Sequence, residues 1–189
     1  EYQDIDAAQY ELVAAIAGRT LEDPDRKLTL LAVGDDDQNI YDFRFTSTAF
    51  IRRFSEDYGG ETHFLTENYR STRHIIDAAN TLIAHNRERM KADQPIRPDR
   101  ARRDAAAGGD WQARDPLAQG RVQVLHVADA AAQATALVAE FERLRGLCPA
   151  LDWQDFAVLA RTHEELMPVR AALDARGIPM AWSSAARTL

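Results

Sequence analysis

The sequence has very little cysteine and no long apolar run. A single cysteine, Cys148, cannot form a disulfide within the chain, which favours a reducing compartment. No stretch of about 18 consecutive apolar residues occurs, so no membrane-spanning helix is expected. The opening Glu1-Tyr2-Gln3-Asp4 lacks the basic start and apolar centre of a signal peptide. These features predict a cytoplasmic protein that does not enter a membrane.

Positive charge is also scarce. The net charge is −7, and Lys27 and Lys91 are the only lysines, so arginine supplies almost all of the positive charge. An acidic balance argues against a protein that coats nucleic acid through bulk charge. Any contact with nucleic acid must therefore be local and must depend on stacking.

The remaining composition is that of an ordinary globular chain, with 189 residues of which 46% are hydrophobic. Short apolar runs alternate with segments of helical periodicity, which predicts an α/β fold with a parallel sheet. The expected strands are 28–33, 63–65, 122–127, 156–160 and 178–182. The expected helices are 5–17, 46–58, 72–89, 130–146 and 163–176. Residues 91–120 are rich in proline and glycine and are interpreted as a long loop or a partly disordered insert.

Three polar clusters follow predicted strands, at 34–44, 66–70 and 161–163. In an open parallel sheet, ligands bind beyond the carboxyl ends of the strands. The three clusters are therefore expected to converge on one ligand site.

The first cluster admits several interpretations. It could be an acidic, solvated turn before a helix. Tyr41, Phe43 and Arg44 could instead form a platform on which exposed bases stack, which needs no net positive charge. Asp35 and Asp37 could also hold a metal and a nucleotide sugar, as in some glycosyltransferases, although this leaves the aromatic residues without a role.

The second cluster runs from Leu65 to Thr72. Arg70 precedes a predicted helix, and anions are favoured at a helix N-terminus. A guanidinium at this place could contact a γ-phosphate, and Tyr69 could stack on adenine. The alternative is a simple helix cap followed by a surface arginine.

These residues carry a resemblance to a known family. The segment Val33–Arg44 resembles motif III of UvrD/Rep/PcrA-type superfamily 1 helicases, and Leu65–Thr72 resembles their motif IV. Residues 1–4 resemble the end of motif II, and 156–182 resemble part of their domain 2A. The resemblance implies a RecA-like parallel sheet of the P-loop NTPase fold, incomplete and in two partial lobes. Residues 1–60 would end domain 1A, and residues 61–189 would begin domain 2A.

The resemblance implies nucleotide-binding roles for five residues. Glu1 would polarise the attacking water, and Gln3 and Gln38 would lie near the nucleotide, where Gln38 senses the γ-phosphate. Tyr69 would stack on adenine, and Arg70 would contact the γ-phosphate. The implied cofactors are ATP and Mg²⁺. The magnesium-binding aspartate of motif II has no counterpart, so no metal ligand is assigned.

The resemblance also implies that Tyr41, Phe43 and Arg44 contact single-stranded DNA. There are departures from the family pattern. Phe43 stands where many relatives have Trp, and Phe45-Thr46 replaces the usual Gly-Ala, so the turn into the next helix is expected to differ.

No phosphate loop of the form Gly-x-x-x-x-Gly-Lys-Ser/Thr occurs in the 189 residues. The sequence is therefore interpreted as a fragment of an ATP-dependent 3′–5′ DNA helicase or single-stranded DNA translocase, inactive alone. Its expected partners are single-stranded and duplex DNA and the rest of the helicase chain, and uncovered sheet edges would favour self-association. The alternatives are a non-catalytic module that binds DNA or protein, and the metal-dependent sugar transferase.

Overall fold

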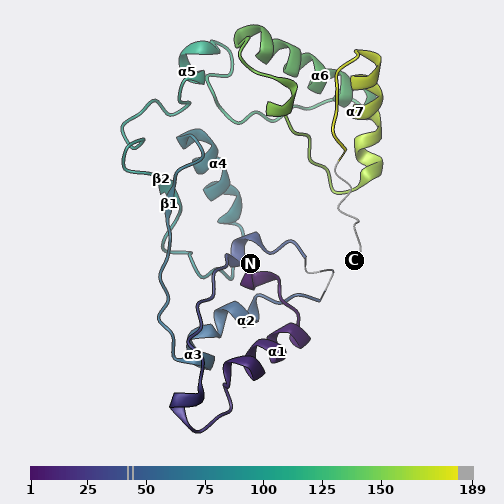
Figure 1. Cartoon of the computed structure of the whole chain (residues 1–189). Helices are drawn as coiled ribbons and strands as arrows, with labels where there is room; N and C mark the ends of the chain where they lie inside the picture. Colours follow the sequence, from purple (N-terminus) through teal and green to yellow (C-terminus); the bar gives the residue numbers. More distant parts are fainter. Residues whose placement is uncertain (42, 44, 183–189) are drawn as a thin grey trace. The chain divides into compact units, whose positions relative to one another are not determined.

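The structure is a computed structural model that describes residues 1–41, 43 and 45–182 (Figure 1). Arg44, one of the predicted DNA contacts, lies outside the described residues. The chain packs as two compact units, Glu1–Ala105 and Ala106–Leu189. Each unit is held together by its own contacts.

The first unit combines helices with a single pair of strands. The helices are α1 (Ala7–Ala17), α2 (Ala49–Arg52), α3 (Phe54–Tyr58) and α4 (Arg73–Ile83). Short 3-10 turns are η1 (Tyr2–Asp4), η2 (Pro24–Arg26) and η3 (Asp36–Gln38). The strands β1 (Glu67–Asn68) and β2 (Arg97–Pro98) pair in parallel, with Glu67 opposite Arg97.

Helix α1 forms close to its predicted place because both of its ends are well specified. The Asp6 side chain accepts a hydrogen bond from the Gln9 backbone, and the Gln9 side chain accepts one from the Asp6 backbone. Gly18 ends the helix with φ of 70°, a left-handed conformation that suits glycine. In the interior, the rings of Tyr10 and Phe50 stack with centroids 4.3 Å apart. This stacking joins α1 to α2.

Two predicted helices are shorter than the sequence suggested. The helix expected over 46–58 is interrupted at Arg53, which separates α2 from α3. The helix expected to reach residue 89 ends at Ile83. Beyond it, the Arg89 side chain and the Met90 backbone bind carboxylates of residues 36–37. These long-range contacts replace the last turns of the expected helix.

The five predicted strands are not formed as such in the described part of the chain, where the only strand pairing is β1 with β2. A strand is defined by ladder hydrogen bonds to a neighbouring strand, and among the described residues the apolar runs at 28–33 and 156–160 pair with no other strand. Their side chains are accordingly exposed, with Leu31 at 88% and Leu159 at 93%. The prediction that these runs are buried on both faces is therefore wrong for this structure. The parallel sense of strand pairing is retained in β1 and β2.

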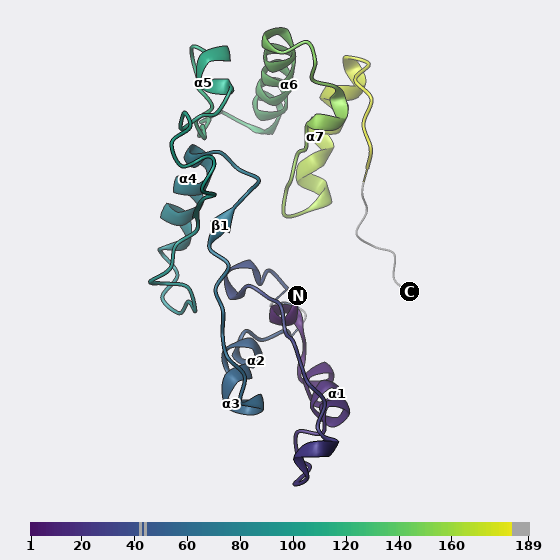
Figure 2. The same ribbon diagram turned by 60° about the vertical axis from the view of Figure 1, so that its left-hand side comes forward.

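The second unit is built on two packed helices. Its helices are α5 (Trp111–Arg114), α6 (Ala130–Leu147) and α7 (His163–Ala175), with a 3-10 turn η5 (Trp153–Asp155). Helices α6 and α7 lie side by side in both views of the chain (Figures 1 and 2). Apolar side chains fill the space between them and the segment after α7. They are Ala134, Val138, Val169, Leu173 and Ile178.

The ends of α6 and α7 agree with the predicted helices at 130–146 and 163–176. Thr162 caps α7 in a reciprocal arrangement with Glu165, and Gly177 follows the helix with φ of 63°. Among the described residues, no helix combines the length and the apolar character needed to span a membrane.

The expected insert at 91–120 consists mostly of turns, as predicted, but it is anchored rather than detached. Asp115 is buried, and its carboxylate accepts hydrogen bonds from the backbone of Leu117 and Ala118. Arg143 on α6 donates to the same carboxylate at 2.7 and 3.1 Å. The Arg143 guanidinium lowers the pKa of Asp115 to about 2. The interpretation of this segment as partly disordered is therefore not supported.

Candidate functional site

The first polar cluster forms a tight turn that lies against the N-terminal segment. The Asp35 backbone N–H donates to Gln3 Oε1 at 3.1 Å, and Asn39 Nδ2 donates to the Gln3 carbonyl at 2.7 Å. Gly34 allows this approach, because a Cβ atom there would lie 2.7 Å from Ile51 Cδ1 and 2.8 Å from Gln3 Oε1. The structure thus places Gln3, which is buried, beside the turn.

The two predicted nucleotide-binding glutamines meet at one aspartate. Gln38 Nε2 donates to Asp35 Oδ2 at 2.7 Å, while Gln3 accepts from the backbone of the same aspartate. Glu1 is exposed at the start of the same segment. The structure therefore places residues 1–4 beside residues 34–39, although the two segments are 30 positions apart in the sequence.

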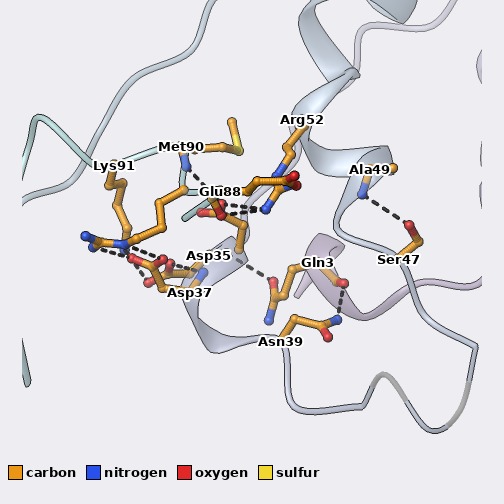
Figure 3. Close-up of polar contacts among 12 residues, drawn as sticks. Gln3, Asp35, Asp37, Asn39, Ser47, Ala49, Arg52, Glu88, Met90 and Lys91 are labelled. Atoms are coloured by element: carbon orange, nitrogen blue, oxygen red, sulfur yellow. Dashed lines mark hydrogen bonds and ion pairs between the residues drawn. The ribbon is translucent and has the colours of Figure 1, made fainter. Parts of the chain in front are cut away.

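The three aspartates Asp35–Asp37, here called the acidic turn, are held by basic residues that follow α4 (Figure 3). Arg89 donates two parallel hydrogen bonds to the Asp37 carboxylate, Nε to Oδ1 at 2.9 Å and Nη2 to Oδ2 at 2.8 Å. Lys91 Nζ lies 2.6 Å from Asp35 Oδ2. Burial alone would raise the pKa of the Asp35 carboxyl, but hydrogen bonds from Lys91 and Gln38 outweigh it and lower that pKa.

The middle aspartate of the turn is buried and has its own partners. Asp36 Oδ2 accepts a hydrogen bond from the Met90 backbone at 2.9 Å and lies 3.5 Å from Arg52 Nη2. Arg52 also donates to Glu88 Oε2 at 2.8 Å. The acidic turn is therefore tied both to α2 and to the segment after α4.

These contacts bear on whether the acidic turn can bind a metal ion. Ligand atoms of Asp35, Asp36 and Asp37 lie within 4.8 Å of one another, as a metal site requires. Each carboxylate, however, already faces a cationic side chain or a backbone donor, so a divalent cation would compete with arginine and lysine. The turn does not fit a Mg²⁺ site, and the same argument removes the support for a metal-dependent sugar transferase.

The aromatic side chains after the acidic turn face solvent. The rings of Tyr41 and Phe43 have centroids 6.1 Å apart and planes inclined by 51°. Phe43 is 76% exposed and Phe45 is more exposed still. An apolar ring that lies open next to another ring can accept a base on its face. Phe45 also has φ of 64°, which L-residues with a bulky side chain rarely adopt.

The second cluster leads into α4. Asn68 Oδ1 accepts from the backbones of Arg70 at 2.9 Å and Ser71 at 2.7 Å, which turns the chain from β1 toward the helix. Thr72 occupies the N-cap position, but its side chain makes no capping bond, and its buried Oγ1 has no hydrogen-bond partner within the described residues. Arg70 is exposed beside this end.

An uncapped helix start with an orphaned hydroxyl and an adjacent guanidinium fits an anionic oxygen, such as that of a phosphate. Tyr69 is exposed too, and its hydroxyl donates to Glu67 Oε2 at 3.0 Å, which raises the pKa of Tyr69. Within the described residues, no hydrogen bond or ion pair joins Arg70 to Gln38. The expectation that both residues approach one γ-phosphate stays a prediction.

The third cluster belongs to the second unit, so the expected convergence of three clusters is not reproduced within one unit. Thr162 caps α7, and the Arg161 backbone N–H donates to Glu165 at 3.0 Å. A cavity of about 410 Å³ lies beside them, lined in part by Val158 and Ala160. The cluster therefore begins helix α7 of the second unit.

Sequence reasoning missed the basic partners of the acidic turn. The sequence pattern assigns Arg89 to a helix end and Lys91 to an insert, although the two residues lie 52 and 56 positions from their aspartates. No periodic pattern signals a contact over such a separation. The one available signal is charge, since three consecutive acids that become partly buried require compensation.

Comparison with known proteins shows two family matches. Residues 1–59 match the UvrD/REP helicase N-terminal domain, and residues 63–187 match the UvrD-like helicase C-terminal domain. The second match alone covers well over half of the chain.

Individual relatives agree with these matches. The chain is 32% identical over 180 residues to the ATP-dependent DNA helicase PcrA of Leuconostoc citreum, covering 95% of this chain and 21% of that protein. It is 35% identical over 180 residues to the ATP-dependent DNA helicase UvrD1 of Mycobacterium tuberculosis, with the same coverage. DNA helicase II of Haemophilus influenzae is 40% identical over 90 residues, 48% of this chain and 11% of that protein. The chain thus spans about a fifth of the length of the relatives that it matches most fully.

Proposed function

The chain belongs to the UvrD-like helicase family, and from this membership we propose that it forms part of an ATP-dependent 3′–5′ DNA helicase or single-stranded DNA translocase. Relatives named as ATP-dependent DNA helicases support the proposal, as does their length of nearly five times the matched part. The longer polypeptide that we propose is here called the whole helicase. Its substrates would be ATP and DNA.

One observation carries the proposal. Gln38 directly follows the acidic turn and donates to Asp35, and the exposed rings of Tyr41 and Phe43 follow Gln38 by three and five positions. The short separation gives a direct backbone route by which a change at Gln38 would reach the two rings. A group that responds to nucleotide and a surface that accepts bases are thus joined in one element, as an ATP-driven translocase requires.

We propose the following roles for the nucleotide-binding residues. Arg70, at the uncapped start of α4, contacts a phosphate oxygen and stabilises the negative charge that develops during hydrolysis. Gln38 and Gln3 lie at the edge of the nucleotide site, and Glu1 orients water. Tyr69 stacks on the base of ATP. The hydrolysis of ATP supplies the free energy for movement.

The DNA-binding roles fall on the aromatic loop. The rings of Tyr41 and Phe43 stack on successive bases of a single strand, and Arg44 contacts the strand as the family resemblance implies. Stacking on an aromatic ring contributes about 1–3 kcal/mol per base. Binding of this kind is compatible with the acidic charge of the chain.

We also propose that the fold of the whole helicase supplies the missing neighbours of the apolar runs at 28–33 and 156–160. The two lobes would be RecA-like, with residues 1–60 ending the first and 61–189 beginning the second. The boundaries of the family matches, 1–59 and 63–187, support this division. The packing of this structure divides at Ala105 instead, because the segment after α4 binds the acidic turn.

The experiment that tests the proposal measures ATP hydrolysis by the purified whole helicase with and without single-stranded DNA, together with unwinding of a duplex that carries a 3′ tail. We expect DNA to stimulate hydrolysis and the 3′-tailed duplex to be unwound in preference to a 5′-tailed one. The 189 residues alone should hydrolyse no ATP. A whole helicase that binds DNA but hydrolyses no ATP would instead favour a non-catalytic DNA-binding module.

A further inference from the structure

We propose that Arg89 and Lys91 position the acidic turn and thereby link DNA binding to ATP hydrolysis. The contacts of these two residues with Asp37 and Asp35 are here called the clasp. The inference rests on the proposed function, because it assigns a role within the same loop. It concerns residues that lie outside the nucleotide-binding and DNA-binding groups themselves.

The geometry of the clasp is specific at both contacts. Arg89 and Asp37 form a two-bond pair that fixes the orientation of the carboxylate as well as its distance. Lys91 Nζ and Gln38 Nε2 both approach the same oxygen, Asp35 Oδ2, at 2.6 and 2.7 Å. Lys91 therefore acts on Gln38 through a single shared atom.

The clasp is shielded from solvent. The side chains of Arg89 and Asp37 are 9% and 11% exposed, and Lys91 is buried. Ion pairs at the surface contribute little and are screened by salt, whereas removing one member of a buried pair leaves a charge without compensation. A clasp of this kind holds the turn in one conformation. Removal of either partner would leave a buried charge without compensation and release the turn.

The clasp and Arg70 lie beyond opposite ends of helix α4. Arg89 follows the C-terminal end of α4, and Arg70 precedes its N-terminal end. An α-helix of 11 residues is a rigid rod about 16 Å long. A displacement of Arg70 on contact with a phosphate would move α4 and, through the clasp, the turn that leads to Tyr41 and Phe43. The clasp also joins residues that belong to the two proposed lobes.

The test uses the whole helicase with Arg89→Gln, which removes the charge and the two-bond geometry. The matched control is Arg87→Gln, because Arg87 is exposed two positions earlier and makes no hydrogen bond or ion pair among the described residues. Four quantities are measured for each protein: the basal kcat of hydrolysis, KM for ATP, Kd for a single strand, and the stimulation of kcat by saturating DNA. The melting temperature serves as a check on folding.

We expect Arg89→Gln to lower the stimulation by DNA at least tenfold, while basal kcat, KM and Kd stay within about twofold. Arg87→Gln should match the unsubstituted protein. The exchange Arg89→Asp with Asp37→Arg should recover at least half of the lost stimulation, because it restores an ion pair at the same place. Recovery of this kind would separate positioning from a general loss of stability.

Two outcomes would overturn the inference alone: normal stimulation in Arg89→Gln, or a parallel fall of basal rate, binding and stimulation that the exchange does not reverse. The second outcome would assign the pair to stability only. Absence of DNA-stimulated hydrolysis in the unsubstituted whole helicase would overturn the proposed function, and the clasp inference with it.

Discussion

The substitution Phe43→Ala tests the aromatic loop most sharply, because the structure separates its effect on binding from its effect on folding. Phe43 is 76% exposed, so its removal takes little apolar area out of the interior and should leave the free energy of unfolding nearly unchanged. If one base stacks on the ring, the loss is about 1–3 kcal/mol. At 1.4 kcal/mol per factor of ten, Kd for a single strand should rise by about 5-fold to 140-fold.

Fluorescence anisotropy with a labelled oligothymidine at fixed salt concentration measures this change in the whole helicase. Leu82→Ala is the matched control, since Leu82 is 74% exposed on α4. We expect Leu82→Ala to leave Kd unchanged and Phe43→Trp to lower it, because a larger ring offers more stacking area. An unchanged Kd in Phe43→Ala, with normal melting, would show that no base stacks there and would refute the assignment of the loop.

The remaining predictions concern stability and are measured by denaturation of the 189-residue chain. Phe45→Gly should raise the free energy of unfolding by about 1 kcal/mol, because glycine adopts φ of 64° without strain, whereas Phe45→Ala should not. Leu173→Ala should lower it by about 2–5 kcal/mol, since Leu173 is buried between α6 and α7; a loss below 1 kcal/mol would contradict that packing. Asp35 has a lowered pKa in the folded state, so its ionised form stabilises the fold above the unfolded pKa of about 3.9 and loses this effect as pH falls through the lower, folded value. The difference in stability between the unsubstituted chain and Asp35→Asn should therefore shrink in acid; a difference that grows as pH falls would contradict the ion pair with Lys91.

Local signals in the sequence predicted much of the helical structure. The ends of α1, α6 and α7 depend on caps and glycines within a few residues, such as Asp6, Thr162 and Gly18. The polar cluster at 34–44 could likewise be recognised because its acids, aromatics and glutamine are contiguous. These features are local, and their physical causes act over one or two helical turns.

Long-range pairing could not be predicted in the same way. The apolar run at 28–33 has the composition of a buried strand, but a strand also needs a neighbour, and a single segment does not specify one. The shortened α4 has the same explanation, since Arg89 pairs with Asp37 across 52 positions and leaves the helix. Sequence periodicity reports which side of an element is apolar and does not report which distant charge will bind to its end.

The most direct test of the proposed role of Arg70 compares ATP hydrolysis and DNA binding in the whole helicase carrying Arg70→Ala. An arginine that stabilises the transferred phosphoryl group typically contributes about 10³-fold or more to kcat. We predict a loss of that size in DNA-stimulated hydrolysis, with Kd for a single strand within about twofold of normal. Hydrolysis at the unsubstituted rate in Arg70→Ala would contradict the claim that α4 brings this residue to the nucleotide.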